Sequence, residues 1–276
     1  MKTPVILVPT DFSDSSNNAA EYAWSLAKVM KASLILYHAY HIPVPTTGMP
    51  MMIVSSEQLD KENIERLHSY RAQLKKKFGN DITIDCITTA GFAVEEIAAV
   101  VKDKQIDFVI MGISGAGKIS QALLGSVTTG VLNEVNVPLL IVPEGAKFSP
   151  LTKVGLAYDY QNEISPKILA ELKTVTSLFK SQLFIIDVES PDEKGNITKA
   201  VSGIKLEQAL ENVEHTLHFP KNSDIVTGLI EFEENHKVDL LIMIPKRHSL
   251  ISRIFNKSNT KRMAFHTHTP ILALHE

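Results

Sequence analysis

A glycine-rich segment in the first half of the chain has a spacing suited to binding phosphate. Gly112 is followed after two residues by Gly115 and after nine more by Gly125, with Ser126 next in the sequence. Glycine lets the backbone approach a ligand closely, and the free N–H groups and dipole at a helix N-terminus favour an anion. We expect Gly125 and Ser126 to open a helix, where the Ser126 hydroxyl and the Val127 N–H add donors. The segment therefore predicts an anion site.

The chain also places a carboxylate where such a site would lie. Asp11 follows an apolar run at 4–9, and Gly112 follows another at 107–111. If both runs are parallel strands, their carboxyl ends meet at one edge of the sheet, where ligands of open α/β sheets bind. Asp11 and the glycines are therefore expected on one site.

Five short apolar runs support that sheet. They lie at 4–9, 33–39, 82–87, 107–111 and 138–142, and they alternate with longer segments at helical spacing. Strands joined through helices run parallel, and nearly continuous apolar strands indicate a sheet covered on both faces. The first half is therefore predicted to be a doubly wound α/β domain.

The chain repeats itself once. Residues 107–111 match 239–243 and 137–142 match 269–274 at an offset of 132, while 6–12 match 154–160 at an offset of 148. The two offsets differ mainly because of a proline-rich segment at 41–50, which has no clear counterpart in the second half and is predicted to be a loop. We predict two domains, 1–147 and 148–276, built as two tandem doubly wound parallel five-stranded sheets with flanking helices.

At these residues the first half resembles the ATP-binding branch of the universal stress protein family. The glycine spacing carries the resemblance, together with the stretches 9–13, 36–39 and 137–138 and with Gly91. The resemblance implies a fold of the adenine nucleotide α-hydrolase type and a stress-related binding or regulatory protein that responds to ATP, ADP or AMP. It extends to the second half through the repeat.

The resemblance also implies roles for seven positions: Asp11, Ala39, Gly112, Gly115, Gly125, Ser126 and Val127. Asp11 and the backbone at Ala39 would face adenine. The first two glycines would lie along the ribose and phosphates. The last three residues would hold the phosphates, with Mg²⁺ helping to neutralise them.

Other interpretations of the same segment stay open. The three glycines could mark turns only, in a structural oligomerisation unit. Gly112, Gly117 and Lys118 match most of a P-loop, but Ile119 stands where a P-loop has its magnesium-binding Ser or Thr. For slow ATP hydrolysis a positioned base is needed, and only Lys118 and hydroxyl side chains lie near the glycines. We therefore predict no catalytic residue and at most weak hydrolysis.

The second half lacks the glycines. At an offset of 132 the three glycine positions carry Ile244, Arg247 and Lys257, while Ser258 matches Ser126. Side chains would occupy the space of the phosphates, so one nucleotide per chain is expected. Asp159 matches Asp11 but is explained as a helix cap. The pair His266 and His268 has no third ligand nearby in sequence, so we predict no metal site.

Composition limits the partners. A net charge of −3 and the short basic clusters give no long-range attraction for nucleic acid, and no apolar run is long enough to cross a bilayer. The first residues do not resemble a secretory signal, and the single Cys86, predicted as strand filler, agrees with a reducing cytosol, so we expect a cytoplasmic protein. The resemblance further implies a pseudo-dimer within the chain, in which 138–142 pairs with 270–274. A homodimer of whole chains is a weaker expectation, and the sequence does not identify a protein partner.

Overall fold

The computed structural model describes residues 2–42, 55–113, 126–160, 164–191, 197–245 and 268–275. The first half contains β1 (Val5–Pro9), α1 (Asp14–Met30), β2 (Ser33–Tyr40), α2 (Ser56–Phe78), β3 (Ile84–Ala90), α3 (Ala93–Asp103), β4 (Phe108–Ile113), α4 (Ser126–Glu134) and β5 (Leu139–Pro143). The second half contains β6 (Lys153–Ala157), α5 (Pro166–Phe179), β7 (Gln182–Ile186), α6 (Ile197–Ala209), β8 (His215–His218), α7 (Ile225–His236), β9 (Leu240–Met243) and β10 (Ile271–Ala273). All five strands predicted in the first half are present, each within three residues of its expected bounds.

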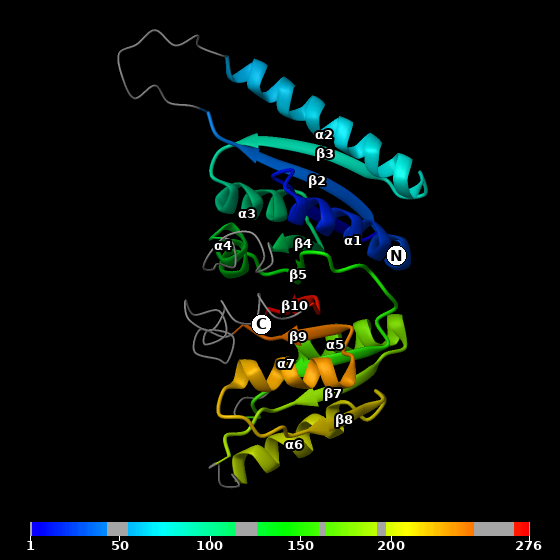
Figure 1. The fold of residues 1–276 in the computed structure, drawn as a ribbon, viewed down its shortest axis with the longest axis vertical. Coiled ribbons are helices and arrows are strands. Elements are labelled where there is room, and N and C mark those ends of the chain that lie inside the picture. Colours follow the sequence, from blue (N-terminus) through cyan, green and yellow to red (C-terminus); the bar gives the residue numbers. More distant parts are fainter. Residues whose placement is uncertain are drawn as a thin grey trace, which may run out of the picture.

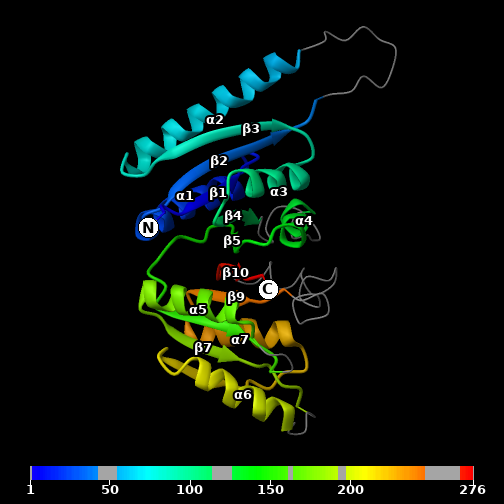
Figure 2. The ribbon, with the colours of Figure 1, turned by 180° about the vertical axis from the view of Figure 1, so that it is seen from behind.

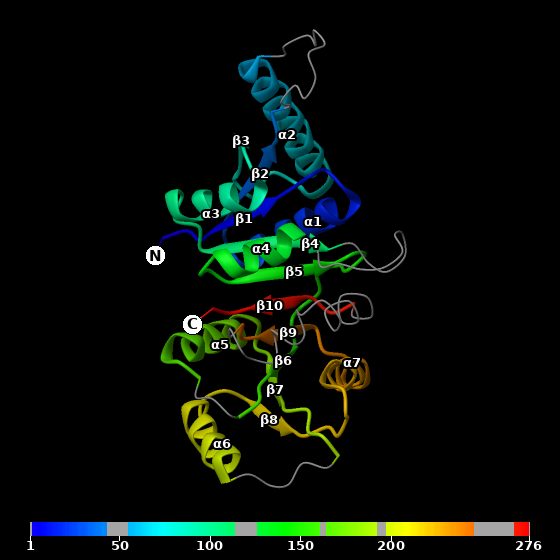
Figure 3. The ribbon, with the colours of Figure 1, turned by 90° about the vertical axis from the view of Figure 1, so that its left-hand side faces the viewer.

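The ten strands of the described ranges form one sheet, in the order β3-β2-β1-β4-β5-β10-β9-β6-β7-β8. Within each half the strands are parallel, and each half has the same order of strands. β5 and β10 pair antiparallel, with Leu272 opposite Leu140, so the two halves meet at the middle of the molecule (Figure 1, Figure 3). The predicted doubly wound α/β fold is confirmed, and the predicted pairing of the two last strands joins the two sheets into one.

Helices cover both faces of this sheet. Alternate strand residues contribute to two buried apolar clusters, one packed against α1, α2, α5 and α6 and the other against α3, α4 and α7. The sheet runs along the long axis, with α2 and β3 at one end and α6 and β8 at the other (Figure 2). Because both clusters contain residues of both halves, each half stabilises the other.

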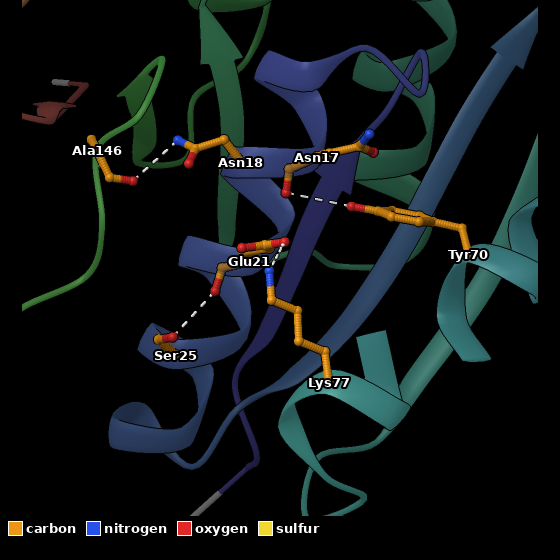
Figure 4. Close-up of polar contacts among 7 residues, drawn as sticks. All are labelled: Asn17, Asn18, Glu21, Ser25, Tyr70, Lys77 and Ala146. Atoms are coloured by element: carbon orange, nitrogen blue, oxygen red, sulfur yellow. Dashed lines mark hydrogen bonds and ion pairs between the residues drawn. The ribbon is translucent and has the colours of Figure 1, made fainter. Parts of the chain in front are cut away.

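The connection between β5 and β6 is held against helices of both halves. The Phe148 ring lies 5.3 Å from that of Tyr22 on α1 and 6.4 Å from that of Phe179 on α5. The Asn18 amide donates to the carbonyl of Ala146 at 3.1 Å (Figure 4). It also donates to the carbonyl of Pro143 at 3.0 Å. The predicted domain boundary at 147/148 falls within this connection and stays a prediction.

Helix α1 is also tied to α2. The Tyr70 hydroxyl donates to the carbonyl of Asn17 at 3.4 Å, and the Lys77 ammonium lies 2.5 Å from the Glu21 carboxylate (Figure 4). α1 begins at the N-cap Ser13, whose hydroxyl accepts from the N–H of Ser16. The contacts with Tyr70 and Lys77 hold the first turns of α1 against α2.

Two smaller predictions can be compared with the structure. Cys86 is only half-buried on β3, and partial burial raises the pKa of its thiol, which does not suit a nucleophile. Among the described residues, no helix is long and apolar enough to cross a membrane. Most of the predicted loop at 41–50 lies outside the described residues.

The junction between the halves gives the first testable prediction. Leu272 is 2% exposed at the centre of β10, so Leu272→Ala should leave a cavity and cost about 2–5 kcal/mol of unfolding free energy. The shared clusters predict that both halves still unfold in one transition in chemical denaturation. Leu178 is 43% exposed, so Leu178→Ala is the control and should change the free energy of unfolding by less than about 0.5 kcal/mol. A separate early transition of the second half alone would contradict this account of the junction.

Candidate functional site

A cavity of about 260 Å³ lies at the carboxyl ends of the strands in the first half. Five of the seven residues singled out in the sequence line it: Asp11, Ala39, Gly112, Ser126 and Val127. They come from four separate segments, namely the ends of β1, β2 and β4 and the start of α4. Gly115 and Gly125 lie in 114–125, outside the described residues, and this segment connects two residues that line the cavity, Ile113 and Ser126.

The strand order explains this location. β1 pairs with β2 on one side and with β4 on the other, so the chain leaves the centre of the sheet in opposite directions after β1 and after β4. The helices that follow these two strands pack on opposite faces, which leaves a crevice beyond the strand ends. The cavity occupies this position.

Asp11 is held as a carboxylate at the rim. The N–H and hydroxyl of Ser13 donate to Asp11 Oδ1 at 3.0 and 2.6 Å. Partial burial raises the pKa of Asp11, but the hydrogen bonds that its carboxylate accepts outweigh burial, the largest of them from Ser13, with smaller ones from Ser16 and the Asp11 backbone. The pKa therefore lies below its ordinary value. The carboxylate is therefore ionised at neutral pH, and it faces the cavity as a hydrogen-bond acceptor.

Hydroxyl side chains make up much of the remaining polar surface, and sequence reasoning did not assign most of them to the site. They are Thr10, Ser13, Ser15, Ser16, Tyr37 and Thr128. The Thr10 and Ser16 hydroxyls lie 3.0 Å apart, and the Tyr37 hydroxyl bonds to that of Thr89. Ser13 is also the N-cap of α1. Tyr37 and Thr10 could have been found from their places at the ends of predicted strands.

Gly112 has a structural role that the sequence did not reveal. A Cβ at this position would overlap the carbonyl oxygen of Ser15 and lie 2.6 Å from its carbonyl carbon. Ser15 belongs to the first turn of α1, so glycine at Gly112 lets this helix pack closely against the end of β4. The packing of α1 against β4 therefore requires glycine at this position, whether or not a ligand binds.

Apolar side chains form the other part of the lining. They are Pro9, Ala39, Ala93, Ile97, Met111, Ile113 and Val127, contributed by β1, β2, α3, β4 and α4. Such a surface suits a flat, weakly polar group, while the hydroxyls and Asp11 suit polar substituents. The cavity can thus hold a ligand with one apolar and one polar part.

The first N–H groups of α4 are donors that have no acceptor within their own helix. In any α-helix the first N–H groups have no intrahelical acceptor, and here the helix begins with Ser126 and Val127 on the cavity wall. The helix dipole adds partial positive charge at the same end. This geometry can bind an anionic group. Lys118, the residue on which the P-loop interpretation depends, lies outside the described residues.

Among the described residues of the second half, buried side chains lie at the positions equivalent to the cavity lining. The strand registers place Tyr158, Val188 and Ile244 at the positions of Thr10, Ala39 and Gly112, and all three side chains are buried. Tyr160 is also buried, with its ring 4.8 Å from that of Tyr158. The other compared positions, Arg247, Lys257 and Ser258, fall outside the described residues.

The predicted absence of a metal site stays a prediction. Within the described ranges, no three His, Cys, Asp or Glu side chains gather as a metal-binding group. His268 is exposed, and His266 belongs to the part of the chain that is not described.

Comparisons with known proteins agree with the resemblance seen in the sequence. The profile of the Universal stress protein family matches residues 3–143. A universal stress protein of Methanocaldococcus jannaschii is 31% identical over 146 residues, which is 51% of this chain and 83% of that protein. A universal stress protein of Synechocystis is 23% identical over 97% of this chain and 98% of its own length. A crystal structure of a universal stress protein from Archaeoglobus fulgidus, 23% identical, superposes with a TM-score of 0.74 over 100% of this chain and 99% of that one, which shows the same fold.

The close packing at Gly112 predicts a stability effect. Gly112→Ala should cost about 1–3 kcal/mol of unfolding free energy, because the added methyl group must displace the first turn of α1. Gly203→Ala on α6 is the matched control, because its Cβ would meet nothing closer than 3.5 Å and alanine is the better helix former. The control should be at least as stable as the wild type. Equal stability of the two variants in urea denaturation would reject the packing role.

The contact between Ser13 and Asp11 predicts a change in titration. Ser13→Ala removes the hydroxyl donor, so the pKa of Asp11 should rise, as carboxyl NMR can measure. Since the folded pKa of Asp11 is depressed, its contribution to stability is present above the unfolded value of about 4 and is lost as the pH falls through the folded value. The variant should therefore show less of this loss on acidification. An unchanged Asp11 titration would show that Ser13 does not set the pKa.

Proposed function

The chain belongs to the universal stress protein family, and on that premise we propose that it binds an adenine nucleotide in its first half. Binding would make the protein a nucleotide-responsive regulatory module in a stress response. One observation carries the proposal: five residues chosen from the sequence as a nucleotide site line a single cavity. Four separate segments contribute them, so their meeting is not a consequence of sequence proximity.

The two kinds of lining match the two ends of a nucleotide. Ala39 lies on β2, next to the apolar side chains, where adenine can lie with Asp11 as an acceptor for a polar group of the ligand. Ser126 and Val127 lie on the other side of β1, beyond β4, where the start of α4 can bind phosphate. The described lining gives about 260 Å³, slightly below the ~300 Å³ at which small-molecule sites usually begin. AMP, ADP and ATP share these contacts, so the described residues favour none of them over the others.

A bound Mg²⁺ fits this proposal if it is held mainly by the phosphates of the nucleotide. Mg²⁺ prefers oxygen ligands and is usually held through substrate phosphates with few protein ligands. The Ser126 hydroxyl is an oxygen at the phosphate end, and the lining contains no cluster of carboxylates that would bind the ion alone. The ion would neutralise phosphate charge, and Ser126 and the α4 donors would hold the phosphates in place.

Binding without efficient hydrolysis is the better supported activity. Asp11 is the one ionisable side chain in the described lining apart from the Tyr37 phenol, and the donors on Ser13 hold it as a low-pKa carboxylate. A base with a depressed pKa accepts a proton poorly at neutral pH. The described residues therefore offer no observation that favours an ATPase over a binding protein.

The second half is proposed to act through packing and contacts with partners. Its equivalent positions carry buried side chains in place of a cavity lining, so one nucleotide per chain is expected. The cytoplasmic location, the protein partner and a homodimer of whole chains stay predictions.

A substitution at Ser126 tests phosphate binding at α4. Ser126→Asp should weaken the binding of AMP and ATP by at least about 100-fold, because a fixed carboxylate occupies the place of the phosphate and repels it. An aspartate at a helix start is favourable, so the fold should be as stable as before. Calorimetry with AMP, ATP and adenosine measures the effect. The affinity for adenosine, which has no phosphate, should change little.

Ser126→Asn is the matched control, since it has the same size without the charge. It should bind AMP within about fivefold of the wild type, because the backbone donors of α4 remain. Equal AMP affinity of the Asp and Asn variants would place the phosphates elsewhere, and no binding of any adenine nucleotide to the wild type would overturn the proposed function.

A further inference from the structure

A buried histidine of the second half contacts the helix that begins at the nucleotide cavity. His275 follows β10 and is 9% exposed. Its Nε2 lies 2.9 Å from the carbonyl oxygen of Leu132, and its Nδ1 lies 3.0 Å from that of Val137. Leu132 belongs to the end of α4, and Val137 to the connection between α4 and β5. The two partners lie 143 and 138 residues away from His275 in the sequence.

The Leu132 carbonyl is one that its own helix cannot satisfy. The last four carbonyls of an α-helix have no intrahelical donor, and α4 ends at Glu134. Water or a local cap usually serves these groups, whereas here a side chain of the other half lies within bonding distance. Leaving a buried carbonyl without a donor is costly, so this contact constrains where α4 ends.

A second group reaches the same place from α5. The Lys167 ammonium donates to the carbonyl of His275 at 2.7 Å and lies 3.4 Å from that of Asn136. Asn136 belongs to the same connection as Val137. Two elements of the second half, α5 and the end of β10, therefore hold the segment that leaves α4.

The His275 ring has one proton for two acceptors. Burial lowers the pKa of His275, the two carbonyls raise it, and the charge of Lys167 lowers it, with the net value below the ordinary one. The ring is therefore neutral at pH 7 and donates from one nitrogen at a time. The Nε2–H tautomer bonds α4, and the Nδ1–H tautomer bonds the connection that follows it.

We propose that His275 is a positioning residue through which the second half sets the place of α4 at the nucleotide cavity. A nine-residue helix is a rigid rod about 14 Å long, so a shift at Leu132 moves Ser126 and Val127 with it. The second half thus controls the phosphate end of the cavity. The effect on nucleotide affinity rests on the proposed function, whereas the placement of α4 does not.

Thermodynamic linkage makes the coupling reciprocal. If the contact at His275 favours the binding position of α4, then a nucleotide at the start of α4 must favour the contact at His275 by the same free energy. The second half thus has a function without a ligand of its own, because nucleotide binding in the first half changes the contact that the second half makes at His275.

Three variants separate the two ring contacts. His275→Phe keeps the ring and loses both donors, His275→Gln keeps a donor near the place of Nε2, and His275→Asn keeps one near the place of Nδ1. His268→Phe, at an exposed histidine nearby in sequence, is the control. Amide hydrogen exchange of the full chain without nucleotide reports the placement of α4.

The α4 amides should exchange about tenfold faster in His275→Phe and His275→Asn, while His275→Gln and His268→Phe should resemble the wild type. Amides of β1 and β2 should be unchanged in all four, which separates local release of α4 from general loss of stability. Equal α4 exchange in the Phe and Gln variants, or uniform acceleration across the sheet, would overturn the positioning role.

Calorimetry with AMP then tests the coupling. The Phe variant should bind several-fold more weakly than the Gln variant, and AMP should slow exchange at residues 271–275 of the wild type. Unequal α4 exchange with equal AMP affinity would contradict the coupling and leave the proposed function standing. If the wild type bound no AMP, ADP or ATP, the proposed function would fail, and the exchange experiment would still decide whether His275 positions α4.

Discussion

The antiparallel pairing of β5 with β10 is the constraint on which the rest of the structure depends. It joins two parallel five-stranded halves edge to edge, so each half covers a strand that would otherwise be exposed. Leu140 and Leu272, paired across this junction, are both buried. The pairing also brings the end of β10 beside the end of α4, and thereby makes the contact at His275 possible.

The two halves keep one backbone plan but differ at the place where a ligand would bind. Phe12 and Tyr160, which follow β1 and β6, both have left-handed backbone conformations, with φ of 64° and 52°. This conformation is unusual for residues with bulky side chains, so the shared turn is a specific feature of both halves. Next to it the first half has a cavity whose lining includes Thr10 and Gly112, whereas the second half has buried Tyr158 and Ile244 at the equivalent positions. A conserved backbone therefore supports a site in one half and packing in the other.

Much of the fold could be predicted from sequence because it depends on regular patterns. Short apolar runs located the strands. The repeat at an offset of 132 made Ile244 the equivalent of Gly112, and the strand registers of the two halves agree. The site residues at strand ends followed from the topology. The close contact of Gly112 with Ser15 and the bridge from His275 to Leu132 could not be predicted, because they depend on distances between segments far apart in the sequence. Gly115 and Gly125 stay predictions, since they lie outside the described residues.

The central claim is that the first half binds an adenine nucleotide and the second half does not. Equilibrium dialysis of the full chain against labelled ATP with Mg²⁺ tests it most directly, with the Ser126→Asp variant measured in parallel. We expect a stoichiometry of about one nucleotide per chain and almost none in the variant, since a single cavity in the described residues combines Asp11, Gly112 and the start of α4. A stoichiometry near two, or one that survives the substitution at Ser126, would contradict the claim.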